Sequence, residues 1–253
     1  MADNRPIGVF DSGVGGISVL RELKKALPCE DFIYYGDGAN APYGVRTTEN
    51  VIELSKKVAD FLQEKNVKCI VIACNTATAA SLHALRAYCS VPVIGIEPAV
   101  ALANTMLHGG KVLAMATPGT IASARFADIL REHGESCIPM PCPGLMEFVE
   151  RGETESQALH AYFDELLKDV DREQVDVTVL GCTHYPFVKN ALSSHMRPDC
   201  RFIDGSMKTL AELKACLEEK AAFTDRGDEG TVSLHSSAGE MSIRHMEMLL
   251  NMP

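Results

Sequence analysis

The sequence lacks the long apolar run that a membrane-spanning helix or the core of a signal peptide requires. Its first residues, Met-Ala-Asp-Asn-Arg-Pro, lead directly into a short apolar stretch at residues 7–10. We therefore expect a cytoplasmic protein. In that compartment the nine cysteines are expected to be thiols rather than disulfides. Most of them should be small, buried, apolar side chains.

The sequence is also short of positive charge, with 24 lysines and arginines against 34 aspartates and glutamates. The resulting net charge of −10 argues against a nucleic acid or an anionic membrane as the principal partner. It does not exclude a small anionic substrate, because a local site can be electropositive inside an acidic protein.

Low-complexity segments and long linkers are absent as well. Hydrophobic residues make up 46% of the chain and charged residues 23%, which is typical of a soluble globular protein. A length of 253 residues is enough to bury a sizeable core, either in one large domain or in two of ordinary size.

Short apolar runs alternate with longer amphipathic segments along the whole chain. An apolar stripe with helical spacing predicts a helix over 48–66, and the same period predicts helices over 159–170 and 207–220. Strands are predicted at residues 7–10, 32–35, 70–73, 112–116 and 177–180. This alternation predicts an α/β fold with mostly parallel sheets that helices cover on both faces.

A short repeat divides the chain into two similar halves. Val-Ile-Ala-Cys-Asn-Thr at 71–76 and Val-Leu-Gly-Cys-Thr-His at 179–184 each close an apolar strand. Upstream of each, another strand ends in a turn, at Asp11 and at Thr117. These two turns are separated by nearly the same number of residues as the two cysteines. We expect two pseudo-symmetric α/β domains, 1–97 plus 208–253 and 98–207. The tail, with a helix, a strand near 231–235 and a final helix, should pack on the first domain.

Ligands of open α/β sheets bind beyond the carboxyl ends of the strands, which selects the loops 11–16, 37–44, 74–78, 117–120 and 182–186. The first of these, Asp-Ser-Gly-Val-Gly-Gly, can present backbone N–H groups to a carboxylate or a phosphate. Its glycine spacing matches neither the dinucleotide fingerprint nor the phosphate-binding P-loop. An ordinary strand-to-helix turn explains this segment equally well.

Cys74 and Cys182 differ from the other cysteines because each ends an apolar strand and is followed at once by polar residues. A thiol in that position, near a helix N-terminus, is favoured as thiolate. His184, two residues beyond Cys182, could assist its proton transfers. Cys69 enters its strand from the opposite end and is predicted to lie in the core. No comparable setting surrounds Cys29, Cys89, Cys137, Cys142, Cys200 and Cys216.

Three kinds of chemistry are open to such a pair. A metal site of Cys74, Cys182 and His184 is conceivable, although the spacing matches none of the usual zinc motifs. A cysteine hydrolase needs one nucleophile and a separate histidine base, which leaves the second cysteine unexplained. Two facing thiols can instead remove a proton from one face of a carbon and deliver another to the opposite face. Their ordinary pKa of about 8.5 makes both protonation states accessible near neutrality.

The loops together resemble those of the glutamate racemases in the aspartate/glutamate racemase superfamily. The resemblance rests on Asp-Ser-Gly-Val-Gly-Gly at 11–16, Pro-Tyr-Gly at 42–44, Ala-Cys-Asn-Thr-Ala-Thr at 73–78 and Gly-Cys-Thr-His-Tyr-Pro at 181–186. It covers roughly the first 205 residues in order, and the Thr-His-Tyr-Pro continuation points to the glutamate branch rather than the aspartate branch.

This resemblance implies that Cys74 deprotonates D-glutamate and Cys182 deprotonates L-glutamate. Asp11 would support Cys74, whereas His184 and Glu150 would support Cys182. Residues at positions that hold the amino and carboxylate groups of the substrate are Asp11, Ser12, Tyr43, Gly44, Asn75, Thr76, Thr183 and His184. It further implies an active site between the two domains, no pyridoxal phosphate or metal, a homodimer, no nucleic-acid or membrane partner, and D-glutamate for peptidoglycan synthesis.

Several of these assignments have a plain structural alternative. Asp11 could merely cap the following helix, and Glu150 could be an ordinary solvated carboxylate. The histidines with no matching motif are expected to be ordinary: His83, His108, His133, His160, His195 and His235. The segment 235–240 departs from the tail of the family, which leaves the packing of the tail and the binding of an activator open. An aspartate-type racemase or another superfamily enzyme, and a binding protein on the same scaffold, are the competing functions.

Overall fold

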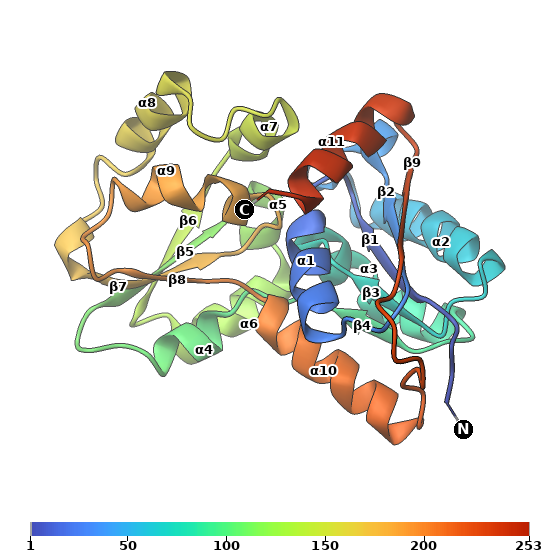
Figure 1. Ribbon diagram of the computed structural model, residues 1–253. Coiled ribbons are helices and arrows are strands. Elements are labelled where there is room, and N and C mark those ends of the chain that lie inside the picture. Colours follow the sequence, from blue (N-terminus) through green and yellow to red (C-terminus); the bar gives the residue numbers. More distant parts are fainter. Residues whose placement is uncertain (1, 253) are drawn as a thin grey trace. The chain divides into compact units, whose positions relative to one another are not determined.

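The computed structural model describes residues 2–252 and divides the chain into two compact units. Unit 1 holds the residues up to Glu97 together with those from Ser206 onward, and unit 2 holds Pro98–Gly205. Each unit is an α/β structure built on one parallel sheet, as the sequence pattern predicts (Figure 1). Within the part of the chain that the structure describes, no helix is long and apolar enough to cross a membrane.

The sheet of unit 1 has five parallel strands in the order β4-β3-β1-β2-β9. The central strand β1 and its neighbour β3 are buried along their whole length, and such continuous burial is typical of a parallel sheet covered on both faces. Strand bounds are β1 Ile7–Asp11, β2 Phe32–Gly36, β3 Cys69–Ile72, β4 Val93–Gly95 and β9 Val232–Ser236.

Helix α2 (Thr48–Glu64) shows how the sequence pattern produces the helical cover of this sheet. The side chain of Thr47 accepts a hydrogen bond from the backbone N–H of Asn50 and so caps the first turn. Val51, Val58 and Leu62 are buried against the sheet, which confirms the predicted apolar stripe. The remaining elements of unit 1 are α1 Ile17–Ala26, η1 Gly38–Asn40, η2 Tyr43–Val45, α3 Asn75–Tyr88, α10 Ser206–Glu219 and α11 Glu240–Leu250.

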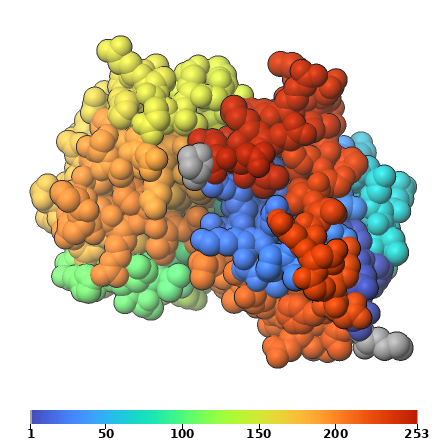
Figure 2. Space-filling model, viewed as in Figure 1, coloured from blue at the N-terminus to red at the C-terminus, as the bar shows by residue number. Residues whose placement is uncertain are grey.

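The C-terminal tail is an integral part of unit 1. Strand β9 pairs in parallel with β2, and α10 and α11 both contact α1. Figure 2 shows the orange and red surfaces of the tail around the blue surface of α1. The predicted helix, strand and final helix are therefore confirmed, and they lie on the first half of the chain as expected.

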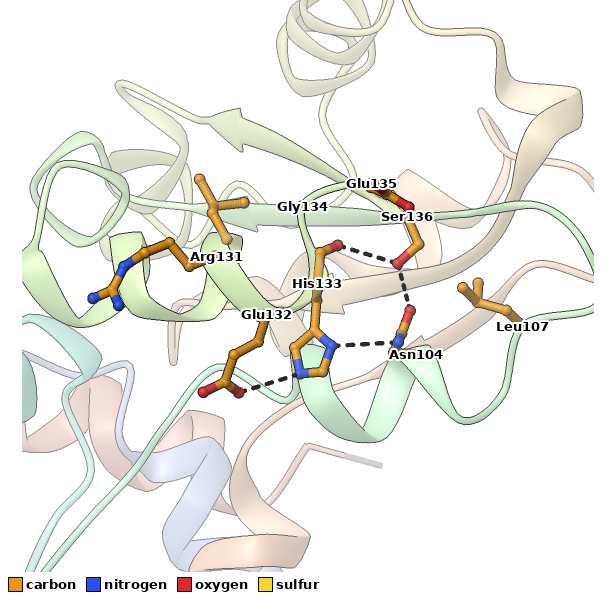
Figure 3. A pocket seen from close by; sticks show the side chains of 9 residues that line it. Asn104, Leu107, Arg131, Glu132, His133, Gly134, Glu135 and Ser136 are labelled. Atoms are coloured by element: carbon orange, nitrogen blue, oxygen red, sulfur yellow. Dashed lines mark hydrogen bonds and ion pairs between the residues drawn. The ribbon is translucent and has the colours of Figure 1, made fainter.

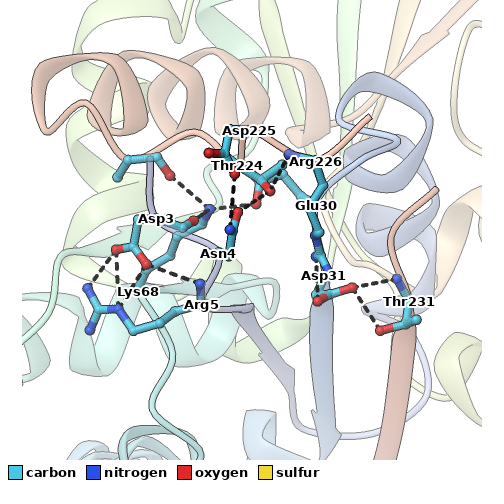
Figure 4. A network of polar contacts seen from close by, with 11 residues as sticks. Asp3, Asn4, Arg5, Glu30, Asp31, Lys68, Thr224, Asp225, Arg226 and Thr231 are labelled. Atoms are coloured by element: carbon cyan, nitrogen blue, oxygen red, sulfur yellow. Dashed lines mark hydrogen bonds and ion pairs between the residues drawn. The ribbon is translucent and has the colours of Figure 1, made fainter. Parts of the chain in front are cut away.

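A buried ion pair fastens the ends of unit 1 to its sheet. Lys68 Nζ lies 2.5 Å from Glu30 Oε2, with the two side chains 0% and 2% exposed (Figure 4). The same ammonium group donates to the carbonyl oxygens of Asp3 and Ala222, both at 2.8 Å. Glu30 in turn accepts a hydrogen bond from the backbone N–H of Thr224. One lysine thereby joins the N-terminal segment and the segment that leads into β9.

The sheet of unit 2 has four parallel strands in the order β6-β5-β7-β8. Val112, Val177 and Val179 lie at the centre of its core, packed with Phe126. The strands are β5 Lys111–Ala116, β6 Cys137–Pro141, β7 Val175–Leu180 and β8 Arg201–Ile203. The helices are α4 Val100–Asn104, α5 Pro118–Ile121, α6 Ala124–His133, α7 Leu145–Glu150, α8 Gln157–Leu166, η3 Arg172–Gln174, η4 Tyr185–Val188 and α9 Lys189–Ser193.

The two sheets share one topology. Read in the reverse direction, the order in unit 2 is β8-β7-β5-β6, which matches β4-β3-β1-β2 in unit 1 strand for strand. Cys74 follows β3 and Cys182 follows β7, so the two cysteines occupy equivalent places in the two units. The pseudo-symmetry expected from the sequence repeat is confirmed at the level of strand order.

Candidate active site

Cys74 lies at the junction between β3 and α3. It is the N-cap residue of α3, and its Sγ accepts a hydrogen bond from the backbone N–H of Ala77 at 3.4 Å. The thiol also donates to Ser12 Oγ at 3.6 Å and is only 6% exposed. The unpaired N–H groups of a helix start, which favour negative charge, lie at this position.

Asp11 ends β1, the strand that pairs with β3, and its side chain is fully buried. Its Oδ1 accepts a hydrogen bond from the backbone N–H of Gly13 at 2.8 Å. The N-cap of α1 is Gly16, which has no side-chain capping bond, so Asp11 shapes the turn rather than capping the helix. A Cβ at Gly16 would lie 2.6 Å from Asp11 Cβ, which explains the requirement for glycine beside this carboxylate.

Tyr43 is held by an aspartate that the sequence-based reasoning did not select. Its hydroxyl donates to Asp37 Oδ2 at 2.7 Å, and Asp37 also accepts hydrogen bonds from Asn40 and Ser237. Burial, together with the neighbouring carboxylate of Asp37, raises the pKa of Tyr43 far above its ordinary value. Gly44 continues the same short helix, η2. Its place in the loop 37–44, which was selected because it follows a predicted strand, was the only signal for Asp37 in the sequence.

Asn75 begins α3 directly after Cys74 and carries a buried side-chain amide. Its side chain is 6% exposed, and its Oδ1 has no hydrogen-bond partner in the structure. A buried acceptor without a donor costs free energy, and a ligand with an N–H group can relieve that cost. Thr76, the next residue in the first turn of α3, is partly exposed.

In unit 2, Cys182, His184 and Glu150 form a continuous chain of polar contacts. Cys182 Sγ lies 3.6 Å from His184 Nδ1, and His184 Nε2 lies 2.8 Å from Glu150 Oε1. The side chain of His184 is 2% exposed and that of Glu150 is 30% exposed. Glu150 ends α7 and reaches back to a histidine 34 positions later in the chain, so it is not a freely solvated carboxylate.

His184 is tuned by this chain of contacts. Burial alone lowers the pKa of its imidazole, but the hydrogen bonds to Cys182 and Glu150 and their charges raise the pKa well above the ordinary value. The raised pKa favours the protonated form of the imidazole beside the thiol. Thr183, between the two residues, is buried.

The two cysteines differ in what supports them. Cys74 caps a helix of 14 residues, whereas Cys182 precedes the short helix η4, whose N-cap is His184. The helix N-terminus that the sequence predicts beside each thiol is thus present at Cys74. At Cys182 the neighbouring polar group is instead the imidazole of His184. Burial raises the pKa of Cys69 to about 12, in agreement with its predicted place in the core.

The family model described as Asp/Glu/Hydantoin racemase matches residues 7–213. The chain belongs to this racemase family. The glutamate racemase of Clostridium novyi (strain NT) is 46% identical over 235 residues, which cover 92% of this chain and 91% of that protein. This racemase is therefore an isomerase that acts on an amino acid.

Solved structures of glutamate racemases agree with the fold of this racemase. Isoform RacE1 from Bacillus anthracis has a TM-score of 0.86 at 32% identity, covering 96% of this chain and 92% of that one. The enzyme of Francisella tularensis, solved with D-glutamate, has a TM-score of 0.83 at 29% identity and covers 99% and 95% of the two chains.

A separate cavity of about 670 Å³ lies in unit 2 of the racemase (Figure 3). It is lined by residues that precede β5 and β6, among them Leu107, His133 and Ser136. These residues stand at the amino ends of the strands, whereas Cys182 follows the carboxyl end of β7. The cavity is therefore distinct from the cysteine loops. Among residues 2–252, no three histidine, cysteine or carboxylate side chains are grouped to hold a metal ion.

Proposed function

We propose that this racemase interconverts L- and D-glutamate with two thiols, Cys182 for the L enantiomer and Cys74 for the D enantiomer. The observation that carries the proposal is the equivalent placement of the two cysteines after β3 and β7. Each thiol has its own polar support, which is Ser12 and a helix N-terminus for Cys74 and His184 for Cys182. Glutamate as the substrate follows from the relatives that carry that name.

The chemistry balances with these groups alone. In the L-to-D direction the thiolate of Cys182 takes the α-proton, so the C–H bond breaks and an S–H bond forms. The carbanion is then protonated from its other face by the thiol of Cys74. His184, oriented by Glu150, would supply or hold the proton of Cys182, and Asp11 would serve Cys74 in the same way. We expect no requirement for pyridoxal phosphate or metal.

The substrate would be held mainly by groups of the carboxyl-end loops. Asn75 Oδ1, which is buried without a partner, is suited to accept a hydrogen bond from the amino group. Backbone N–H groups of the loops that contain Ser12, Gly44 and Thr183 are suited to the carboxylates, with Tyr43 and Thr76 completing the pocket. We further propose that the enzyme is cytoplasmic, because thiol chemistry needs a reducing compartment. We also propose that it forms a homodimer and supplies D-glutamate for peptidoglycan, as the family resemblance implies.

Heavy water gives the sharpest test of this mechanism. During the first tenth or so of conversion of L-glutamate, the D-glutamate formed should carry deuterium at the α-carbon, while the remaining L-glutamate stays largely unlabelled. The reason is that the delivered proton comes from a different thiol, which has already exchanged with solvent. Mass spectrometry of the separated enantiomers measures both. Substantial α-protium in the early product would assign both faces to a single base.

Cysteine variants test the assignment of the two groups. Cys74→Ala and Cys182→Ala should each lower racemisation in both directions by at least about 10²-fold, because every turnover needs one acid and one base. Cys69→Ala, in the buried strand that leads to Cys74, is the matched control and should only cost stability. Parallel assays with L-aspartate separate an aspartate-type racemase from the proposed activity. Assays in excess chelator test whether the activity is independent of metal.

A further inference from the structure

Three side chains converge on the carboxylate of Asp37, which follows β2 directly and is buried. Its Oδ2 accepts a hydrogen bond from the hydroxyl of Tyr43 at 2.7 Å, and its Oδ1 accepts one from Ser237 Oγ at 2.7 Å. The side-chain amide of Asn40 lies 3.0 and 3.1 Å from the two oxygens and donates to them. The carboxylate therefore joins two points of the loop after β2 to the C-terminal tail.

The tail holds this loop through its backbone as well. Ser237, the residue after β9, accepts a hydrogen bond from the backbone N–H of Ala39 at 3.0 Å, and its own N–H donates to the carbonyl oxygen of Gly36. A Cβ at Gly38 would lie 3.0 Å from the Cβ of Ala238, so the loop and the tail are in close contact. A segment that diverges from the family thus borders the loop that contains Tyr43.

Tyr43, which Asp37 holds, belongs to the same buried cluster as Cys74. Burial, and then the hydrogen bond and the charge of Asp37, raise the pKa of Tyr43. The charges of Cys74 and Asp11 add to this rise. The hydroxyl therefore stays protonated at neutral pH and remains a donor to Asp37. The backbone N–H of Asp37 also donates to the carbonyl oxygen of Asp11 at 2.9 Å, which ties the loop to the end of β1.

We propose that Asp37 is a positioning residue of this racemase, which fixes Tyr43, and through it the backbone of Gly44, where the substrate binds. Ser237 extends this role to the tail, because its hydroxyl holds the same carboxylate. The inference rests on the proposed function, in which backbone N–H groups of the loop with Gly44 bind a carboxylate of glutamate. A loop that is held before the substrate arrives lowers the entropic cost of binding. Asp37 carries no reacting atom, so it acts on binding rather than on proton transfer.

The contacts of Asp37 require an acceptor on both side-chain atoms. Oδ1 receives the hydroxyl of Ser237 and Oδ2 receives that of Tyr43, while Asn40 donates to both. An ionised carboxylate accepts at both oxygens, whereas an amide of the same shape has one acceptor and one donor. Asp37→Asn therefore turns a donor toward one of the two hydroxyls and also removes the charge that strengthens these bonds. The variant should loosen the loop without leaving a cavity.

Steady-state kinetics with L- and D-glutamate test the inference. Asp37→Asn should raise KM by about ten-fold in both directions while kcat falls by less than about three-fold. Tyr43→Phe should raise KM by a similar factor. Adding Asp37→Asn to Tyr43→Phe should raise KM by less than about two-fold more, because the contact through which Asp37 acts is already lost. Full multiplication of the two effects would overturn the proposal.

Ser237 variants test the contribution of the tail. Ser237→Ala should raise KM by about two- to four-fold, which is less than the effect at Asp37, because that carboxylate keeps its bonds from Tyr43 and Asn40. Ser237→Thr restores a hydroxyl at an exposed position and should return KM to the value of the unchanged protein. A threonine that fails to restore KM would contradict the role given to this hydroxyl.

Asp31 provides the matched control, because it lies at the other end of β2 from Asp37. Its Oδ1 accepts hydrogen bonds from the backbone N–H and the hydroxyl of Thr231, the residue before β9 (Figure 4). Both aspartates therefore join β2 to β9, but only Asp37 contacts Tyr43. Asp31→Asn should lower the Tm measured by circular dichroism and leave KM unchanged.

KM and Tm together separate positioning by Asp37 from general stabilisation. An unchanged KM in Asp37→Asn would overturn the proposal. An equal rise of KM in Asp31→Asn would overturn it too, because the rise would then follow from lost stability. Absence of glutamate turnover by the unchanged protein would refute the proposed function itself, and with it this inference.

Discussion

At the scale of single residues, the contact between Glu150 and His184 is the one most open to experiment. Glu150→Gln removes the negative charge 2.8 Å from His184 Nε2, and the raised pKa of His184 should therefore fall. Protonated His184 would then be lost at lower pH, so the alkaline limb of the pH–rate profile should move to lower pH. We expect the rate at neutral pH to fall by about ten-fold or more.

The control for this variant lies on the same helix. Glu147 is exposed on α7 and should tolerate replacement by glutamine with an unchanged pH profile. An unshifted alkaline limb in Glu150→Gln, measured in both reaction directions, would mean that Glu150 does not support His184. A loss of activity without any shift would indicate a purely structural role.

At the scale of elements, the segment before β9 depends on a buried charge. Lys68 forms an almost fully buried ion pair with Glu30 and donates to the carbonyl oxygens of Asp3 and Ala222. Lys68→Met leaves the carboxylate of Glu30 buried without its partner, which typically costs about 3–5 kcal/mol of unfolding free energy. We expect a lower denaturant midpoint for unit 1, measured by circular dichroism.

A double variant separates the charge from the packing. Lys68→Met combined with Glu30→Gln should recover part of the lost stability, because no uncompensated charge remains. Lys24→Met, which removes an exposed pair with Glu229, is the surface control and should have little effect. If Lys68→Met were as stable as the unchanged protein, the ion pair would not fasten the tail.

At the scale of the whole molecule, the net charge of −10 should oppose the approach of an anionic substrate. Added salt screens this repulsion, since the Debye length falls from about 30 Å at 0.01 M to about 8 Å at 0.15 M. We expect KM for glutamate to fall up to a few-fold over this range while kcat stays nearly constant. Initial rates at several potassium chloride concentrations provide the measurement. A KM that rises with salt would show that a local positive field at the site outweighs the net charge.

The sequence by itself determined the α/β class, the duplicated halves and the two cysteines at equivalent strand ends. It also determined the positions of most strands, but not those of β4, β6 and β8. These features are local, because the hydrophobic period and the choice of turn residues each depend on a few neighbouring positions in the chain. Contacts between distant positions could not be predicted in this way. Asp37 accepts a hydrogen bond from Ser237, which lies 200 residues later in the chain, and nothing in the sequence of the tail indicates this contact.

Only the tertiary structure decided which distant side chains meet. Glu150 reaches His184 because α7 is packed beside η4, and His160 meets His195 because α8 contacts α9. Such contacts depend on the packing of whole elements, and one sequence carries no periodic signal for them. The sequence, with the family resemblance, therefore selected Cys74, Cys182, His184 and Glu150. The contact of Glu150 with His184 and that of Asp37 with Tyr43 emerged only from the fold.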